Sequence, residues 1–357
     1  MRISWRWRDS RRKRERPPMA EIPTIGRKAP TLTPTGMSGT VLVTGGTGAF
    51  GQAFVDKLLA YHPNTIIRVL SRGEAKQAAM RARLEDNPRL RWIVGDVRDF
   101  SRMRKACRGA DYVVHAAALK RIEVGESDVD EAIKTNVFGS MAVRDAAIEC
   151  QVWRSVLLST DKAVAPNTAY GASKTLAERL WNRGNVYAAG TDCRFAATRY
   201  GNVLGSTGSV VPIWMKQAND TGSITVTNPE MSRFWMTMDQ ACALVFKALQ
   251  TMRGGEVIIP KIPAATISVL AEAVVPGARR VTVGSRPGEK LHESLMGADE
   301  SISAYDAGTH LIIEPQDVSW DQHRVSPVRD YTKVPDRFTY DSDTAPQLTV
   351  NELRGML

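Results

Sequence analysis

From Thr40 onward, the chain alternates between two patterns of hydrophobic residues. Short runs rich in β-branched residues predict buried strands, and six such runs stand out at 40–45, 65–71, 91–96, 111–118, 154–160 and 193–202. Between them, apolar residues such as Phe50, Phe54 and Leu58 recur at the spacing of one face of a helix. Strands that alternate with helices are typical of parallel strands joined by crossover helices. The pattern therefore predicts an α/β fold built on a doubly wound, Rossmann-like parallel sheet.

This alternation breaks after about residue 205. Loops that bear Gly, Pro and Trp follow, with isolated helices predicted at 238–252 and 267–275. We therefore expect residues 39–205 to form the Rossmann domain and residues 206–357 to form mainly a smaller C-terminal region.

No apolar run approaches the roughly 18 residues that a membrane span needs. The start of the chain also lacks the apolar core of a secretory signal, so we expect a cytoplasmic protein. The four cysteines include no CxxC pair and the five histidines show no ligand spacing. We therefore expect reduced thiols and no metal site.

Basic residues gather at the start of the chain. The opening "MRISWRWRDSRRKRER" carries seven Arg and one Lys against Asp9 and Glu15, which is more than half of the net charge of +10. We expect residues 1–38 to be a basic extension without fixed structure. Contact of Trp5, Trp7 and the arginines with a membrane surface or nucleic acid is the alternative. The rest of the chain is only mildly basic, which suits an enzyme for an anionic substrate better than a specific nucleic-acid partner.

A glycine pattern lies between the first predicted strand and the first predicted helix. In "VLVTGGTGAFGQAF", three glycines have the GxxGxxG spacing of a dinucleotide-binding turn. Glycines allow a tight turn and a close backbone approach, so that a pyrophosphate can sit on the free N–H groups of the helix N-terminus. The cofactor residues predicted here are Gly45, Thr47, Gly48, Ala49, Phe50 and Gly51.

The end of the second predicted strand bears on the choice between NAD and NADP. In NAD-binding proteins an Asp or Glu at this position accepts a hydrogen bond from the ribose 2′-hydroxyl. This chain instead has Ser71 and Arg72 there, followed by Lys76. These side chains suit a 2′-phosphate, so we favour NADP over NAD. Solvated surface charges are the alternative interpretation of Arg72 and Lys76. Asp96 ends the third strand, where it would either accept a hydrogen bond from the adenine amino group or cap a turn.

The stretch "STDKAVAPNTAYGASK", residues 159–174, begins at the end of the fifth predicted strand. Tyr170 and Lys174 are four residues apart and fall on one face of a helix. A nearby ammonium and a positive nicotinamide ring would stabilise the phenolate, so Tyr170 would take the proton of an alcohol as hydride leaves its carbon. Thr160 would hydrogen-bond the same alcohol oxygen.

Asp161 and Lys162 come before this pair and predict a further reaction step. Once an alcohol is oxidised to a ketone, the proton on the next carbon becomes acidic. An amine of lowered pKa at Lys162 would remove that proton, while Asp161 would protonate a hydroxyl that leaves one carbon further on. The pair thus predicts loss of water with return of the hydride. A surface Asp and Lys in a loop is the alternative.

Ten motifs carry a resemblance that covers nearly everything from Thr40 to Leu357. They are "TGGTGAFG", "HAAALKR", "KTNVFGS", "STDKAVAP", "YGASK", "RYGNVLGSTGSVVP", "MSRFWMT", "IPKIP", "RPGEKLHE" and "FTYDSD" with "LTVNELR". Together they resemble the extended short-chain dehydrogenase/reductase superfamily. More narrowly, they resemble the soluble UDP-N-acetylglucosamine 4,6-dehydratases that invert carbon 5, of the CapD-like polysaccharide biosynthesis family, which begin pseudaminic acid biosynthesis.

The resemblance implies UDP-N-acetylglucosamine as the substrate, tightly bound and recycled NADP, and a homo-oligomer. It implies that Asp161 is the acid for the 6-hydroxyl and that Lys162 removes the proton at carbon 5 and takes part in its replacement. It implies that residues 206–357 mainly bind the nucleotide sugar, and the substrate contacts predicted are Lys120, Asn202, Arg233, Arg286 and Glu289. The remaining cofactor contacts predicted are Val97, Ala116, Ala117, Ala118, Lys120 and Asn136, besides Tyr170 and Lys174.

Other functions stay open at this point. Relatives that retain the configuration commonly show an Asp-Glu or other pair in place of Asp161 and Lys162, so a retaining 4,6-dehydratase is one alternative. A UDP-sugar 4-epimerase would need the glycines and the Tyr-Lys pair but neither Asp161 nor Lys162. A cofactor-binding scaffold would depend on the basic extension. After Lys120 the chain reads "RIEVGES" where family members usually carry a His and a Pro, so the loop that faces the sugar departs from the family.

Overall fold

The computed structural model describes residues 32–33, 36–206, 209–321, 324–326 and 328–357, so most of the predicted basic extension lies outside the described residues. The described end of that extension, β1 (Leu32–Thr33) and β2 (Gly36–Met37), forms an antiparallel pair. Met37 is buried, and its N–H donates to Nδ1 of His62 at 3.1 Å. Residues 32–33 and 36–37 of the predicted extension thus form regular secondary structure, and the prediction for residues 1–31 lies outside the described residues.

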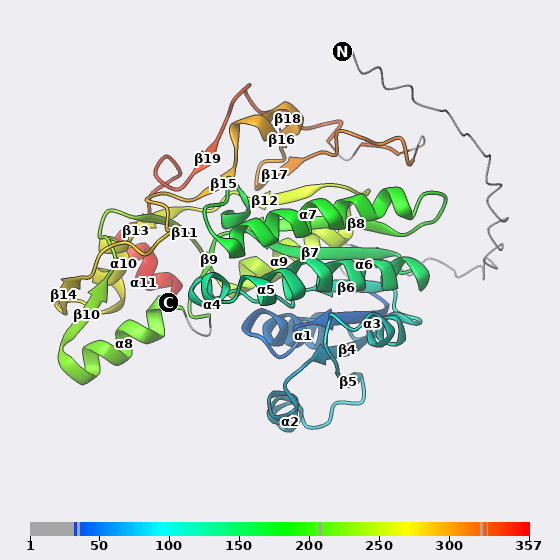
Figure 1. Ribbon diagram of the computed structural model, residues 1–357, viewed down its shortest axis with the longest axis horizontal. Coiled ribbons are helices and arrows are strands. Elements are labelled where there is room, and N and C mark those ends of the chain that lie inside the picture. Colours follow the sequence, from blue (N-terminus) through cyan, green and yellow to red (C-terminus); the bar gives the residue numbers. More distant parts are fainter. Residues whose placement is uncertain (1–31, 34–35, 207–208, 322–323, 327) are drawn as a thin grey trace, which may run out of the picture.

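A ten-stranded sheet forms the centre of the described protein (Figure 1). Its parallel part contains, in spatial order, β5 (Leu90–Val94), β4 (Thr65–Ser71), β3 (Gly39–Thr44), β6 (Tyr112–His115), β7 (Arg154–Thr160), β8 (Arg194–Tyr200) and β12 (Val257–Pro260). Antiparallel strands then continue the sheet as β17 (His310–Ile313), β16 (Ala304–Asp306) and β18 (Thr332–Lys333). The six strands predicted from the sequence appear as β3 to β8, and the doubly wound α/β fold is confirmed.

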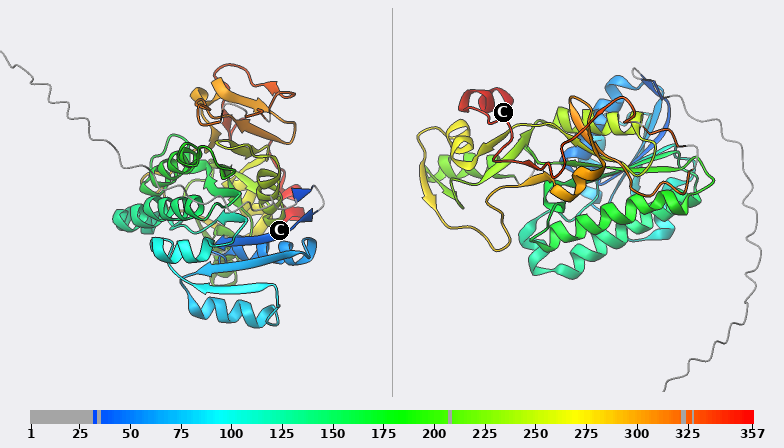
Figure 2. Two further views of the ribbon diagram at one scale, coloured as in Figure 1. Left: turned by 90° about the vertical axis from the view of Figure 1, so that its right-hand side faces the viewer. Right: turned by 90° about the horizontal axis from the view of Figure 1, so that it is seen from above.

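Helices cover both faces of the sheet (Figures 1 and 2). One layer contains α1 (Ala49–Tyr61), α2 (Glu74–Arg83) and α9 (Met238–Thr251), and the other contains α3 (Phe100–Cys107), α6 (Gly139–Glu149) and α7 (Ala169–Tyr187). Phe54 and Leu58 are buried in the first layer, as their spacing predicted, and Trp181 is buried in the second. All seven residues of β7 are buried, because helices cover both faces of the sheet at this strand.

Short elements connect the second layer. α4 (Ile122–Ser127) and α5 (Val129–Ala132) lead into a π-helical turn, Ile133–Phe138, just before α6. A 3-10 turn, Asp161–Ala163, directly follows β7 and begins the connection to α7. These connections surround the carboxyl ends of the strands, so they can shape a site there.

A smaller part of the protein contains its own apolar core, with Trp214, Trp235, Leu270 and Leu353 buried in it. Its elements are β9 (Asn202–Val203), α8 (Val210–Thr221), β10 (Ser223–Val226), β11 (Ser232–Met236), β13 (Ala264–Thr266), α10 (Ile267–Val274), β14 (Arg279–Thr282) and α11 (Val350–Met356). The pair β15 (Ser294–Met296) and β19 (Tyr340–Asp341) and the 3-10 helix Ala298–Ser303 complete the C-terminal half.

Residues after 205 contribute to both parts. α9, β12 and the antiparallel strands lie beyond that position but belong to the large sheet and its helical layer. That residues 206–357 mainly bind substrate stays a prediction. No helix in the part of the chain that the structure describes is long and apolar enough to cross a membrane.

Candidate active site

The strand order reverses at β3, which pairs with β4 on one side and β6 on the other. Open α/β sheets bind ligands at such a switch point, outside the carboxyl ends of the strands. A cleft of about 920 Å³ lies there. Most of the predicted site residues line it, namely Gly45, Thr47, Gly48, Ala49, Phe50, Gly51, Ser71, Arg72, Lys76, Val97, Ala116, Ala117, Ala118, Lys120, Thr160, Asp161, Lys162, Tyr170, Lys174 and Asn202.

The glycine turn has the shape that a pyrophosphate needs. Gly45 has a φ of +67°, and a Cβ there would lie 2.7 Å from the backbone nitrogen of Ala117. A Cβ on Gly51 would lie 2.5 Å from the Gly45 carbonyl oxygen, so only glycine fits both positions. Gly48 is the N-cap of α1, and no side chain caps this helix terminus. Its first-turn N–H groups can therefore hold the pyrophosphate of a dinucleotide.

Arg72 and Lys76 line the cleft beyond the end of β4, as predicted. Asp96 is not among the lining residues. Its carboxylate accepts hydrogen bonds from Arg98 Nε at 3.0 Å and Nη2 at 2.6 Å, and it lies 3.8 Å from Arg72 Nη1. Burial alone would raise the pKa of Asp96, but the hydrogen bonds from Arg98 outweigh it and hold that pKa below its ordinary value. The contact of Asp96 with adenine stays a prediction.

The turn after β7 places two of the predicted catalytic side chains together. Asp161 is 1% exposed, and its Oδ1 accepts hydrogen bonds from the Thr160 hydroxyl at 2.8 Å and from Lys162 Nζ at 3.3 Å. Within the described residues, its Oδ2 is buried and has no hydrogen-bond partner. A buried oxygen left unpaired is costly unless a proton or a ligand satisfies it. Oδ2 of Asp161 is therefore open to a hydrogen bond with a group bound in the cleft.

Tyr170 and Lys174 both lie on α7 and line the cleft. Lys174 Nζ donates to the Leu158 carbonyl at 2.6 Å, and burial lowers the pKa of Lys174 to about 8. Burial raises the pKa of Tyr170 to about 12, even though the Lys162 ammonium and the Thr160 hydroxyl act in the opposite direction. The ammonium that favours the phenolate is therefore that of Lys162 rather than that of Lys174, which the sequence had predicted, and burial outweighs its effect.

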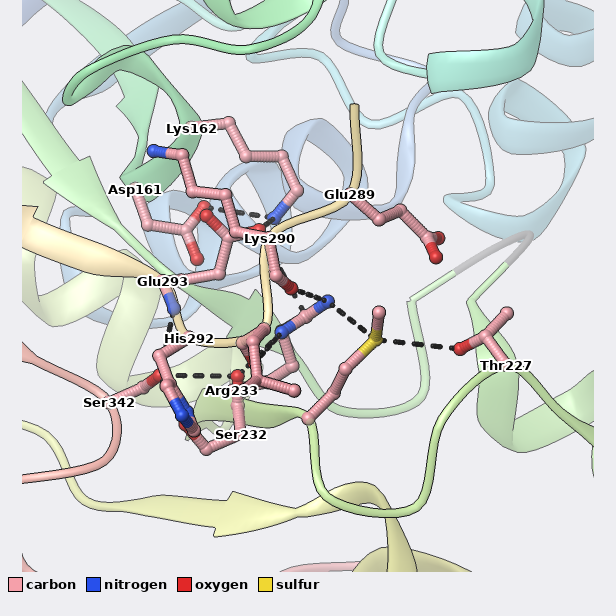
Figure 3. A network of polar contacts seen from close by, with 12 residues as sticks. Asp161, Lys162, Thr227, Ser232, Arg233, Glu289, Lys290, His292, Glu293 and Ser342 are labelled. Carbon is pink, nitrogen blue, oxygen red and sulfur yellow. Dashed lines mark hydrogen bonds and ion pairs between the residues drawn. The ribbon is translucent and has the colours of Figure 1, made fainter. Parts of the chain in front are cut away.

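Lys162 is held between two carboxylates (Figure 3). Its Nζ lies 3.3 Å from Asp161 Oδ1 and 2.8 Å from Glu293 Oε1. Burial alone would lower the pKa of Lys162, but the two carboxylates outweigh burial and raise that pKa above its ordinary value. The prediction of an amine with a lowered pKa is therefore wrong, because the carboxylates of Asp161 and Glu293 both favour the ammonium.

Glu293 lies far from the catalytic turn in the sequence. It is the last residue of the motif "RPGEKLHE" and directly precedes β15. Membership of this motif is the one feature of the sequence that could have indicated a role for it in the site. No spacing or periodicity indicates that its carboxylate reaches Lys162. Other side chains of the cleft that the sequence did not predict include Ile122, Thr135, Ser159, Tyr200, Ser206, Ser209, Trp235 and Met238.

Asn136, a predicted cofactor contact, is not among the lining residues. Its Oδ1 accepts from the Leu119 N–H at 2.8 Å, and its Nδ2 donates to the Leu119 carbonyl at 3.0 Å and to Ser173 Oγ at 2.9 Å. The Ser173 hydroxyl in turn donates to the Tyr170 carbonyl at 2.7 Å. Asn136 thus fixes the loop after β6 against α7, and a direct contact with the cofactor stays a prediction.

Three predicted substrate contacts also lie outside the cleft lining. Arg233 is buried and donates to backbone carbonyls, whereas Arg286 is exposed and its Nη1 lies 2.7 Å from Oε1 of Glu123 on α4. Glu289 accepts a hydrogen bond from the Arg286 N–H at 3.1 Å and points away from the Lys162 network (Figure 3). Their contacts with a nucleotide sugar stay predictions.

The sequence of the chain is similar to those of nucleotide-sugar enzymes and to a family model. The family model described as "Polysaccharide biosynthesis protein" matches residues 41–315. The UDP-N-acetylglucosamine 4,6-dehydratase (inverting) of Campylobacter jejuni subsp. jejuni serotype O:23/36 (strain 81-176) is 40% identical over 313 residues, which cover 86% of this chain and 93% of that protein. The UDP-glucose 4-epimerase of Rickettsia felis is 38% identical over 327 residues, which cover 89% of this chain and 95% of that protein.

Solved structures agree with these relatives. Pen from Bacillus thuringiensis superposes with a TM-score of 0.80 at 34% identity, covering 89% of this chain and 97% of that one. DesIV, a dTDP-glucose 4,6-dehydratase from Streptomyces venezuelae with NAD and TYD bound, superposes with a TM-score of 0.63 at 26% identity, covering 71% of this chain and 86% of that one. The chain therefore belongs to the polysaccharide biosynthesis protein family, and the resemblance to nucleotide-sugar dehydratases of the extended short-chain dehydrogenase/reductase type is confirmed.

Proposed function

We propose that the protein is an NADP-dependent UDP-N-acetylglucosamine 4,6-dehydratase that inverts carbon 5, giving UDP-2-acetamido-2,6-dideoxy-β-L-arabino-hexos-4-ulose. The observation that carries the proposal is the grouping of Tyr170, Asp161 and Lys162 in one cleft. An epimerase needs only the first of these, whereas loss of water needs an acid and a base as well. The name of the C. jejuni relative supports the same reaction.

The residues of this group have separate tasks in the proposed mechanism. A dinucleotide held by Gly45, Gly48 and Gly51 would supply the hydride chemistry between carbons 4 and 6. Tyr170 takes the proton of the 4-hydroxyl, which Thr160 orients. Lys162, as the neutral amine, takes the acidified proton of carbon 5, and Asp161 protonates the departing 6-hydroxyl from its free Oδ2. Lys162 then takes part in returning a proton to carbon 5.

One incubation tests this proposal. Purified protein is mixed with NADP and UDP-N-acetylglucosamine without any reductant, and the product is analysed by mass spectrometry and by NMR. We expect a product lighter by one water, because hydride is lent and returned. UDP-N-acetylgalactosamine as the sole product would identify a 4-epimerase instead, the type of activity named for the Rickettsia relative.

The preference for NADP is part of the proposal and depends on Arg72, which lines the cleft next to the glycine turn. Arg72→Ala is expected to weaken NADPH binding by about ten- to one-hundredfold, the range for a hydrogen bond to a charged group. Binding of NADH is expected to change little. Fluorescence titration with both nucleotides measures this, with Arg81→Ala as the exposed control. An equal loss of affinity for NADPH and NADH would show that Arg72 does not recognise the 2′-phosphate, and the preference for NADP would then have no support.

Arg286 is assigned to the substrate diphosphate, and its exposed ion pair with Glu123 competes with that role. Glu123→Gln is therefore expected to lower the KM for the nucleotide sugar by about two- to fivefold, the range for a surface ion pair. The kcat should stay unchanged, and Arg286→Ala should raise KM. Steady-state kinetics check this, and an unchanged KM in the Glu123 variant would show that the pair does not compete with substrate.

A homo-oligomer and a cytoplasmic location belong to the same proposal, and both rest on the sequence. Sedimentation of the purified protein measures the size of the homo-oligomer directly.

Two predicted substrate contacts, Lys120 and Asn202, line the cleft and are assigned to the sugar.

A further inference from the structure

Glu293 is held firmly beside the catalytic turn. It is 2% exposed, its N–H donates to Ser342 Oγ at 2.9 Å, and its carbonyl accepts from the Ser342 N–H at 2.8 Å. Its carboxylate Oε1 lies 2.8 Å from Lys162 Nζ and 4.0 Å from Arg233 Nε. Within the described residues, its other oxygen, Oε2, is buried without a hydrogen-bond partner. A buried carboxylate needs a cation, and Lys162 is the nearer one.

Arg233 holds the segment that carries Glu293 (Figure 3). Its guanidinium donates to the carbonyls of Ser232 at 2.7 Å, Lys290 at 3.0 Å and Leu291 at 3.1 Å. Lys290 Nζ donates in turn to the Val164 carbonyl at 2.6 Å, just after the catalytic turn. Contacts of Arg233 and of Lys290 therefore fix the position of Glu293 relative to Lys162. A chance contact at the surface would not need such support.

Lys162 must be a neutral amine to take a proton, yet the groups around it favour the ammonium. The charged or titratable groups that face it are Asp161 on its own turn, Tyr170 on α7, Arg233 on β11, and Lys290 and Glu293 before β15. Of the two carboxylates, Glu293 lies closer than Asp161, at 2.8 Å against 3.3 Å. The ammonium therefore contacts both carboxylates, with Glu293 as its nearer partner, and its contact with Asp161 is through Oδ1 rather than Oδ2.

We propose that Glu293 is a positioning residue that holds the proton of Lys162 and so controls when this amine is free to act on carbon 5. The inference rests on the proposed dehydratase function. Glu293 does not line the cleft, so it acts through Lys162 and makes no contact with substrate.

Glu293→Gln tests the proposal, because it keeps the size of the side chain and removes its charge. Without the carboxylate, the ammonium loses a stabilising partner, so the pKa of Lys162 falls and the amine becomes neutral at lower pH. The pH profile of dehydration is expected to shift down by about one unit or more. The hydride-transfer step, followed by the absorbance of reduced nicotinamide, should keep its rate, which also shows that the variant is folded. Glu293→Asp should restore much of the original profile.

A second readout does not depend on the dehydratase reaction. The pH dependence of Lys162 acylation by acetic anhydride, followed by peptide mass spectrometry, reports the neutral amine directly. In Glu293→Gln, acylation is expected to begin about one pH unit lower than in the unchanged protein. The matched control is Glu256→Gln, which removes another buried carboxylate, paired with Arg324 at 2.6 Å, and should leave both profiles in place.

The outcomes separate the two proposals. If the unchanged protein does not dehydrate the nucleotide sugar but acylation of Lys162 shifts in Glu293→Gln, the dehydratase function is wrong, and only the control of the Lys162 proton by Glu293 stands. If dehydration proceeds and neither profile moves in Glu293→Gln, the positioning role is overturned. Equal shifts in Glu256→Gln would also overturn it, since they would show a general loss of stability.

Discussion

Lys162→Ala is expected to stop the reaction after hydride transfer and before loss of water. Lys162 lines the cleft as part of the turn after β7, and its amine is the base assigned to carbon 5. Without it, dehydration should fall by about 10²- to 10⁴-fold, the range for a general base. Reduced nicotinamide should then accumulate when substrate is added. A stopped-flow absorbance trace together with product analysis measures both steps.

Tyr170→Phe is the comparison that separates the steps. It removes the group assigned to the 4-hydroxyl proton, so hydride transfer itself should fail and the nicotinamide should stay oxidised. Lys105→Ala, an exposed change on α3, is the control and should leave both steps intact. If Lys162→Ala dehydrates at the unchanged rate, Lys162 is only a loop residue.

Arg199→Ala is expected to lower the free energy of unfolding by about 3–5 kcal/mol. Arg199 on β8 is 3% exposed and contacts Glu178 on α7 at 2.7 Å and Glu300 at 2.9 Å, and it donates to the Leu295 carbonyl at 3.0 Å. Its removal leaves Glu178 buried without a cation and cuts the link between the catalytic helix and the C-terminal segment. Thermal unfolding should show a melting temperature lower by roughly 10 °C.

Arg83→Ala is the matched control, because it removes an arginine from an exposed pair. Arg83 Nη2 lies 3.0 Å from Asp56 Oδ1, and both side chains are nearly half exposed. Such pairs contribute less than about 1 kcal/mol. Equal losses in the two variants would show that the buried Arg199 cluster adds nothing beyond a surface pair.

The cofactor turn could be predicted from the sequence because its chemistry is local. Gly45, Gly48 and Gly51 lie within one strand, turn and helix, so their spacing alone defines a cradle. The strands could also be predicted, since burial on both faces favours unbroken apolar runs such as residues 41–43 of β3. Tyr170 and Lys174 could be predicted for the same reason, because their spacing within one helix places them on one face.

The ionisation of the catalytic residues could not be predicted in the same way. The raised pKa of Lys162 depends on Asp161 and on Glu293. Glu293 is brought near Lys162 by the pairing of β15 with β19 and by Arg233. These are contacts between distant segments, and no local pattern encodes them. Asn136 shows the same limit, because its amide positions the loop after β6 and α7 instead of lining the cleft.

The central claim is that Tyr170, Asp161 and Lys162 act together to lend hydride, remove water and invert carbon 5. NMR of the product formed from UDP-N-acetylglucosamine in heavy water tests it most directly. The account predicts a 4-keto-6-deoxy sugar of L-arabino configuration with deuterium at carbon 5. A product that keeps the substrate's configuration and its original proton at carbon 5 would contradict the account.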